Sequence, residues 1–244
     1  MGWIDYWDGK PTIYVSRRHR EAHCRSVADG IIAHLERDGL TVLDFGCGEA
    51  LFAAEVASRC RHLYLSDGAP SVRADLERRL GATGNIGIVA PEGLSALAAG
   101  SVDLVVVNSV AQYLGTSDLA QCIDAWKRLL ASGGHILIAD IIPRSVGPAT
   151  DALALLRFAF ANGFLIAAMA GLARTAFSNY RQIRATLGLR QFEEAELIEL
   201  LASHGLEASR VYPNLGHNQS RMAFIATLGH PRTTTHSARG RAQI

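Results

Sequence analysis

The stretch that decides the fold is Val42-Leu43-Asp44-Phe45-Gly46-Cys47-Gly48-Glu49-Ala50. Its apolar start predicts a buried strand over 41–45, and its two glycines predict a tight turn that leads into a helix over 49–59. Glycine allows a sharp turn and a close approach of the backbone to a ligand, and the first turn of a helix offers unpaired N–H groups. The sequence therefore predicts a ligand-binding turn between a strand and a helix.

An acidic residue closes the next expected strand, 62–66. Asp67 lies about 20 residues beyond the turn, where a carboxylate accepts hydrogen bonds from the two hydroxyls of a ribose. A dinucleotide fingerprint requires a glycine at the sixth position counted from Gly46, but that position is Leu51. Asp44, two residues before Gly46, repels a pyrophosphate and attracts an ammonium or sulfonium group. These features favour S-adenosyl-L-methionine over NAD as the cofactor.

Short apolar runs alternate with segments of helical periodicity along the chain. The runs expected as strands of a mostly parallel sheet are 41–45, 62–66, 86–90, 102–108 and 135–142. The helices expected between them are 49–59, 71–80 and 117–130. A helix over 192–203 and a terminal antiparallel hairpin, 207–212 with 221–228, complete a doubly wound α/β sheet of seven strands. Ligands bind such a sheet outside the carboxyl ends of its parallel strands.

The composition is that of a globular protein with a substantial core. Of the 244 residues 49% are hydrophobic and 19% charged, and 24 Lys and Arg nearly balance 23 Asp and Glu. A net charge of +1 provides no field for a long polyanion, so we do not expect nucleic acid as a partner. The four cysteines lack metal-ligand or disulfide spacing, and the N-terminus has no signal-peptide pattern. We therefore expect a reduced, cytoplasmic protein.

Three motifs, in this order, resemble those of the class I S-adenosylmethionine-dependent methyltransferases. The first follows the pattern acid-x-Gly-x-Gly-x-Gly, with Ala50 in place of the third glycine. Residues 101–109 are similar to the family's fourth strand, and residues 129–137 to its helix, glycine turn and fifth strand. The resemblance covers roughly 41–228 and implies a Rossmann-like methyltransferase fold of the small-molecule type.

The resemblance also assigns candidate cofactor contacts. In the family the first turn and its acid hold the methionine end, the acid of the second strand holds the ribose, and residues after the fourth strand line the transferred methyl group. The matching residues here are Asp44, Gly46, Cys47, Gly48, Asp67, Asn108 and Ser109. Glu92 is a candidate substitute for the aspartate that the family often places after the third strand to bind the adenine amine. For Asn108, capping of the next turn is the alternative role.

Three residues are candidate bases. His217 lies in the 214–219 loop between the last two expected strands, at the same edge of the sheet as the cofactor site. A histidine titrates near neutrality and accepts the proton of a hydroxyl or amine. His19 and Tyr113 are the rival candidates, and an exposed loop histidine is the alternative for His217. In-line methyl transfer also proceeds by alignment of the reactants, without a dedicated base.

Residues 1–38 resemble the leading segment that some small-molecule members of the family lay across the cofactor. His19 and His23 are four residues apart, so they share one face of the helix expected there. That spacing suits a metal ion, but no third ligand is apparent. We therefore expect a lid over the cofactor and no metal.

An apolar insertion, 144–190, separates the fifth strand from the last helix, with helices expected over 150–175 and 179–187. Its large side chains surround the helix, which therefore needs cover on several sides; they are Leu153, Leu155, Leu156, Phe158, Phe160, Phe164, Leu165, Ile166, Met169 and Leu172. An apolar substrate, a membrane surface, a homodimer partner and the chain's own packing are the alternatives for that cover. The run 152–173 approaches the length of a membrane span, but because it contains Arg157 we expect a buried or interfacial helix.

The sequence thus predicts one methyltransferase domain over 1–229, with 1–38 as a lid and 144–190 as a cap, followed by a disordered tail over 230–244. The expected activity is methyl transfer from S-adenosyl-L-methionine to a small-molecule acceptor of apolar or lipid-like character. The alternatives are a catalytically inactive partner subunit that binds the same cofactor, and an NAD-dependent oxidoreductase.

Overall fold

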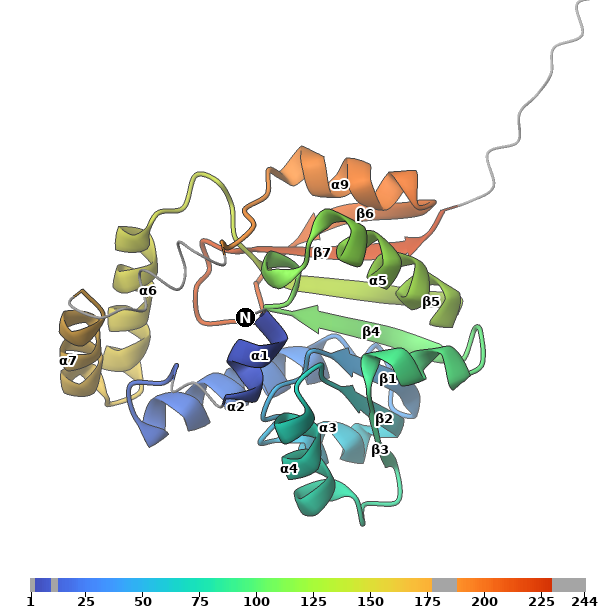
Figure 1. The fold of residues 1–244 in the computed structure, drawn as a ribbon, viewed down its shortest axis with the longest axis horizontal. Helices are drawn as coiled ribbons and strands as arrows, with labels where there is room; N and C mark the ends of the chain where they lie inside the picture. The colour runs from blue at the N-terminus through green and yellow to red at the C-terminus, as the bar shows by residue number, and fades with distance from the viewer. Residues whose placement is uncertain (1–2, 10–12, 177–187, 230–244) are drawn as a thin grey trace, which may run out of the picture.

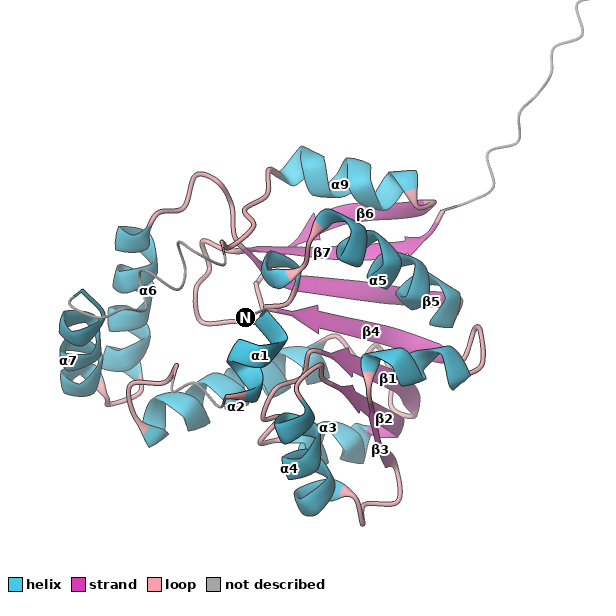
Figure 2. Ribbon diagram, viewed as in Figure 1, coloured by secondary structure: helices cyan, strands magenta, loops and turns pink. Residues whose placement is uncertain are grey.

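The computed structural model describes residues 3–9, 13–176 and 188–229, with a seven-stranded sheet at its centre (Figures 1 and 2). The strands are β1 (Leu40–Phe45), β2 (Cys60–Ser66), β3 (Ile86–Val89), β4 (Val102–Asn108), β5 (Leu130–Ile141), β6 (Leu206–Val211) and β7 (Met222–Leu228). The described α-helices are α1 (Trp3–Asp8), α2 (Arg17–Ala33), α3 (Ala53–Arg59), α4 (Pro70–Leu80), α5 (Thr116–Leu129), α6 (Pro148–Ala161), α7 (Leu165–Ala176) and α9 (Glu194–Ser203). Short 3-10 helices are η1 (Pro91–Ala96) and η2 (Ala111–Tyr113).

The strand order in the sheet is β3-β2-β1-β4-β5-β7-β6. Strands β1 to β5 pair in parallel, whereas β7 pairs antiparallel with both β5 and β6. Strand β6 therefore runs parallel to β5 and ends at the same edge of the sheet. The doubly wound, mostly parallel sheet with a terminal antiparallel hairpin is confirmed, and its chain order reverses between β1 and β4, where such sheets bind ligands.

Alternate residues of the strands are buried against helices on opposite faces of the sheet. Leu43 belongs to a core with Trp126 of α5 and Leu201 of α9. Its neighbour Val42 belongs to a second core with Ile31 of α2 and with residues of α3 and α4. The strands are buried on both faces, which explains why they are continuously apolar in sequence.

The helix that follows the glycine turn was predicted to begin at residue 49, but it begins at Ala53. Gly46, Gly48 and Ala50 have φ angles of +73°, +56° and +39°. A right-handed helix does not admit positive φ. The chain therefore completes the turn before α3 can start.

The prediction of one continuous helix over 150–175 is wrong, because the chain forms two helices there, α6 and α7. Asn162 caps the end of α6, and Gly163 follows with φ +70°. The two helices pack together beyond the carboxyl ends of the parallel strands (Figure 1). Within the described residues, no helix is long and apolar enough to cross a membrane. The helix predicted over 179–187 and the tail 230–244 lie outside the described residues.

Candidate active site

A large cavity of about 1090 Å³ lies at the carboxyl ends of the parallel strands, bordered by α1, α2 and the loop after β6. Ligand pockets usually measure about 300 to 1,000 Å³, so this cavity has room for a nucleoside cofactor together with a second small molecule. We call the part around Asp44 and Asp67 the cofactor end. The part around His19, His23 and His217 is called the histidine end.

At the cofactor end, hydrogen bonds hold the glycine turn against the end of β2. Asp67 accepts the N–H of Gly48 at 3.0 Å on one carboxylate oxygen and the N–H of Ala69 at 2.8 Å on the other. The N–H groups of Gly46 and Cys47 donate to the carbonyl of the last residue of β2. A carboxylate has about four acceptor positions, so Asp67 keeps acceptor capacity for a ligand.

Asp44 lies at the end of β1, and 9% of it is exposed. Burial, together with the nearby charge of Asp67, raises the pKa of the Asp44 carboxyl to about 7, because both disfavour its charged form. Burial also raises the pKa of Asp67 and keeps the pKa of the Cys47 thiol well above its usual range. A cationic ligand stabilises both carboxylates, so this end of the cavity is suited to a positive group.

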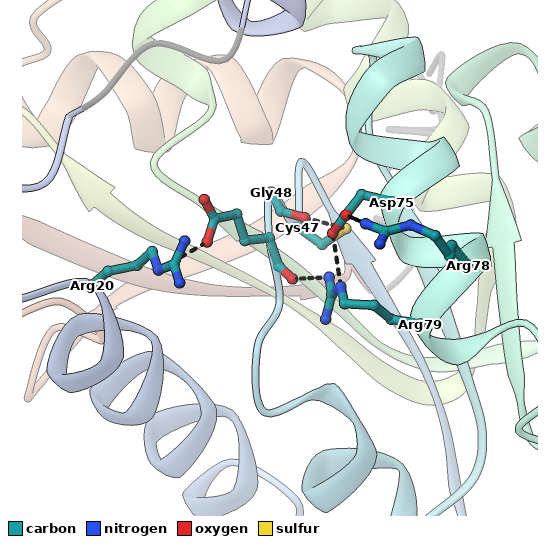
Figure 3. Close-up of polar contacts among 7 residues, drawn as sticks. Arg20, Cys47, Gly48, Asp75, Arg78 and Arg79 are labelled. Carbon is teal, nitrogen blue, oxygen red and sulfur yellow. Dashed lines mark hydrogen bonds and ion pairs between the residues drawn. The ribbon is translucent and has the colours of Figure 1, made fainter. Parts of the chain in front are cut away.

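Glu49 anchors the outer side of the turn to two helices (Figure 3). Its carboxylate pairs with Arg20 of α2 at 3.5 Å, and its backbone carbonyl accepts a hydrogen bond from Arg79 of α4 at 2.5 Å. Arg79 is in turn paired with Asp75 of α4 at 2.7 Å. The position of the turn is therefore coupled to both helices.

Two non-glycine residues at the ends of β4 and β5 hold left-handed backbone. Ser109 has φ +58° and Asp140 has φ +57°. Ser109 Oγ donates to Asp140 Oδ2 at 2.5 Å, and the N–H of Asp140 donates to Asn214 Oδ1 at 2.8 Å. Such strained residues cluster at functional sites, and both Ser109 and Asp140 line the cavity.

Asn108 and Gln112 bring buried amide oxygens to the cavity. Asn108 Oδ1 and Gln112 Oε1 have no hydrogen-bond partner among the described residues. Gln112 is 4% exposed and belongs to η2. A buried acceptor without a donor costs free energy, so a ligand that donates to these oxygens gains affinity.

The histidine end is lined by His19 and His23 of α2 and by His217 of the loop after β6, and aromatic rings of the α6–α7 hairpin pack on these histidines. The ring centroids of His19 and His23 lie 6.5 Å apart. The ring centroid of His217 lies 6.1 Å from that of His19 and 5.9 Å from that of His23. His19 stacks on Phe164 at 4.9 Å, and His217 stacks on Phe158 at 4.7 Å. The described part of the chain contains no group of three or more His, Cys, Asp or Glu placed to hold a metal ion.

Burial keeps these histidines neutral at pH 7. It lowers the pKa of His19 to about 4 and that of His217 to about 4, and it also lowers the pKa of His23. The charge of Asp140 opposes this shift at His23 and His217. His19 Nδ1 accepts the N–H of Val15 at 3.3 Å, whereas His217 Nδ1 is buried with no hydrogen-bond partner among the described residues. His217 is therefore half-buried and not an exposed loop histidine.

The loop that carries His217 is fixed to three elements. Ser26 of α2 donates to the carbonyl of Leu215 at 3.3 Å, and Asn214 accepts the N–H of Asp140 near the end of β5. Asn218 donates to Asp151 of α6 at 2.8 Å. These bonds hold His217 at a defined place in the cavity wall.

Helix α1 lies over the cofactor end. Asp8 accepts the N–H of Ser71 at the start of α4 at 2.7 Å. Trp3 and Trp7 pack on Tyr113 with ring centroids 4.6 Å and 5.6 Å apart. Tyr113 thus packs with α1, whereas His19 and His217 form the histidine end.

Comparison with known proteins identifies a methyltransferase domain within the chain. A family model described as a methyltransferase domain matches residues 43–138, from β1 to β5. The S-adenosyl-L-methionine-dependent methyltransferase fold of a Methanococcus maripaludis protein superposes over 94% of both chains with a TM-score of 0.60 at 13% identity. Residues 43–138 thus match a methyltransferase domain, and the fold of the chain is that of the S-adenosyl-L-methionine-dependent methyltransferases. S-adenosyl-L-methionine is the cofactor of this family.

Two further relatives extend the comparison. Magnesium protoporphyrin IX methyltransferase of Synechocystis, solved with S-adenosylhomocysteine, has a TM-score of 0.52 at 17% identity, over 88% of this chain and 87% of that one. Nodulation protein S of Rhizobium tropici is 29% identical over 139 residues, which are 56% of this chain. The match spans 55% of that protein, or about half its length.

The predicted site residues all line this cavity; they are Asp44, Gly46, Cys47, Gly48, Asp67, Glu92, Asn108 and Ser109 for the cofactor, and His19, Tyr113 and His217 as bases. Asp140 and Gln112 also line the cavity and were not predicted from the sequence. Asp140 had a signal, because it lies near the carboxyl end of an expected strand, where such sheets bind ligands. Gln112 had none, because only its burial distinguishes it.

Proposed function

We propose that this chain transfers the methyl group of S-adenosyl-L-methionine to a small, largely apolar acceptor. The observation that carries the proposal is one cavity with buried carboxylates at one end and three neutral histidines under aromatic rings at the other. The two ends suit a cationic cofactor and an apolar acceptor in contact with a base.

The cofactor end fits S-adenosyl-L-methionine by charge and by donor capacity. Asp67 keeps acceptor positions for the ribose hydroxyls, and Asp44 lies beside the glycine turn, suited to the charged methionine end. The unpaired amide oxygen of Asn108 accepts a donor of the same ligand, and Glu92 offers a carboxylate to the adenine amine. When bound, the cofactor supplies an electrophilic methyl group and leaves as S-adenosylhomocysteine.

At the histidine end we assign the base to His217. Its lowered pKa leaves it neutral at pH 7, and its Nδ1 has no hydrogen-bond partner among the described residues. His217 takes the proton that an acceptor hydroxyl or amine releases as its lone pair bonds to the methyl carbon. The charge of Asp140 then stabilises the imidazolium. Holding acceptor and methyl group in line supplies the rest of the acceleration.

The apolar lining of the histidine end favours an acceptor with an aromatic or aliphatic body. Ile13 and Tyr14 line it, and Phe158 and Phe164 pack on the histidine rings. Burial raises the pKa of Tyr14, so its hydroxyl stays neutral there. One protein of similar fold is magnesium protoporphyrin IX methyltransferase. Its named acceptor is bulky, which supports the proposal that this fold has room for a bulky acceptor.

The two accessory segments support the same scheme. We assign residues 1–38 as a lid, supported by the contact between Asp8 and Ser71, and residues 144–190 as a cap over the acceptor, within one domain over 1–229.

The four cysteines are unpaired, the state that a reducing cytoplasm maintains, and we place the reaction there.

The deciding experiment is a calorimetric titration of the purified chain with S-adenosylhomocysteine, with NAD as the control ligand. We expect micromolar binding of the former alone, followed by turnover in a screen of acceptors that contrasts apolar phenols and polyketide-like compounds with small polar amines. Binding without turnover of any acceptor points to the inactive partner subunit. Binding of NAD points to an oxidoreductase, and turnover of only the polar amines removes the apolar-acceptor assignment.

A further inference from the structure

We propose that the outer face of the α6–α7 hairpin binds the surface of an anionic lipid bilayer, and so places the histidine end of the cavity beside the membrane. We define this docking face by Leu153, Arg157, Phe160, Ile166, Met169 and Arg174. The role in acceptor delivery rests on the proposed function, whereas the binding of lipid does not.

The docking face concentrates exposed large hydrophobic side chains. Phe160 is 78% exposed, Ile166 81%, Met169 50% and Leu153 48%. Only four other large hydrophobic residues of the described chain are exposed to a comparable degree, and they belong to other segments. Leu153 and Phe160 are seven residues apart on α6, and Ile166 and Met169 are three apart on α7, so each pair shares one face of its helix.

The charge on this face selects an anionic partner. Residues 152–176 contain no Asp or Glu, and their only charged side chains, Arg157 and Arg174, are exposed. An apolar face with basic residues and no acid is typical of helices that lie in a membrane interface. A second copy of this chain would bring no acid on the same face to pair with the two arginines, so the bilayer is the favoured occupant.

The inner side of the hairpin is seated on the protein, whereas the docking face on its outer side is exposed. Ala159, Phe164 and Ala168 are buried against α2 and its approach. Gly171 lies so close to Val15 that an added Cβ would meet Val15 Cγ1 at 2.3 Å. The hairpin is therefore seated on the protein by one side, and in the ribbon it lies at the edge of the molecule, away from the sheet (Figure 1).

The same hairpin packs on the histidines that line the histidine end. Phe158 stacks on His217 and Phe164 on His19, while Phe160, two residues after Phe158, is exposed on the docking face. One helix thus separates the candidate base from the outer surface. An apolar acceptor dissolved in a bilayer would reach the cavity without crossing bulk water.

The test is co-sedimentation of the full chain with phosphatidylcholine vesicles and with vesicles that contain 30% phosphatidylserine. We expect binding to the anionic vesicles that weakens as salt is added. Phe160→Ser with Ile166→Ser should reduce the bound fraction about tenfold or more, and Arg157→Gln with Arg174→Gln should remove the preference for phosphatidylserine. Tyr212→Ser, an exposed aromatic residue elsewhere (71% exposed), is the matched control and should bind as the unchanged chain does.

Three outcomes overturn the inference: no binding of the unchanged chain to either vesicle, binding that the face variants leave unaltered, or a dimer in light scattering that Phe160→Ser with Ile166→Ser dissolves while vesicle binding is absent. Melting curves establish that the variants fold. Calorimetry with S-adenosylhomocysteine runs in parallel, because the face variants should retain cofactor binding. Loss of cofactor binding in the unchanged chain would count against the proposed function and leave the lipid result standing.

Discussion

Ser109 and Asp140, at the ends of two neighbouring parallel strands, share a 2.5 Å hydrogen bond while both hold left-handed backbone. Each such conformation costs about 1 to 3 kcal/mol in a residue other than glycine. Asp140 is further fixed by Asn214, whose loop carries His217. This arrangement connects the edge that lines the methyl-transfer site to the candidate base, and it makes Asp140 a positioning residue.

Replacement of Asp140 by Asn tests that role. Asn also tolerates left-handed backbone, so we expect the melting temperature to change little while the negative charge is lost. Since Asp140 raises the pKa of His23 and His217 against burial, both values should fall further in NMR titrations, and kcat should drop about tenfold or more. Asp38→Asn, at an exposed pair with Arg59, is the control. Unchanged histidine titrations would contradict the role.

Asp44→Asn should stabilise the ligand-free fold and weaken cofactor binding. Asp44 has a folded pKa of about 7, above its unfolded value, so the native state holds the extra proton and stability falls as pH rises from about 4 to 7. The Asn variant escapes this cost, which is a few kcal/mol at most. We expect the variant to melt at a higher temperature than the unchanged chain at pH 8 and at the same temperature at pH 4. Its affinity for S-adenosyl-L-methionine should be at least tenfold lower. A destabilised variant with unchanged affinity would make Asp44 structural.

Cofactor binding should depend on pH with a fixed sign. A bound cation favours the ionised form of Asp44, so binding releases a proton below pH 7 and affinity for S-adenosyl-L-methionine rises between pH 6 and 8. Calorimetry in two buffers of different ionisation enthalpy measures that proton. Asp44→Asn should abolish the release. Proton uptake on binding would reverse the expected charge assignment.

Gly46→Ala and Gly48→Ala form a matched pair. A Cβ at Gly46 would lie 2.2 Å from Val110 Cγ2, whereas one at Gly48 meets nothing within 4 Å. Both positions have positive φ, so each variant carries strain of about 1 kcal/mol, and Gly46→Ala adds a clash of about 1 to 3 kcal/mol. Urea unfolding should therefore show the larger loss for Gly46→Ala, with partial recovery in Gly46→Ala combined with Val110→Ala. Equal losses would mean that the clash relaxes freely.

His217→Gln should lower kcat about 100-fold or more for a hydroxyl acceptor and leave cofactor affinity intact. Because burial lowers the pKa of His217 to about 4, kcat of the unchanged chain at saturating cofactor should persist on the acid side to about pH 5. His19→Phe, which retains an aromatic ring against Phe164, is the comparison. If His19→Phe loses the activity and His217→Gln keeps it, the base is His19.

The break between α6 and α7 has a local signal in the sequence. Asn162-Gly163 is a turn dipeptide, yet the apolar run around it predicted one helix. The three histidines show a different limit. Helical spacing placed His19 beside His23, and topology placed His217 at the same edge, but neither could say that the three meet, since their contacts join residues nearly 200 positions apart.

The sequence by itself determined the order of strands and helices, the acid and glycine turn with Asp67, and through them the cofactor, because these features depend on local periodicity and on the backbone freedom of glycine. Only the tertiary structure decided what surrounds each group. It buried Asp44 beside Asp67, paired Ser109 with Asp140, placed Gln112 in the cavity wall and exposed Phe160 while it covered Phe158. Burial and charge proximity arise from packing between distant segments, so a local sequence pattern does not predict them.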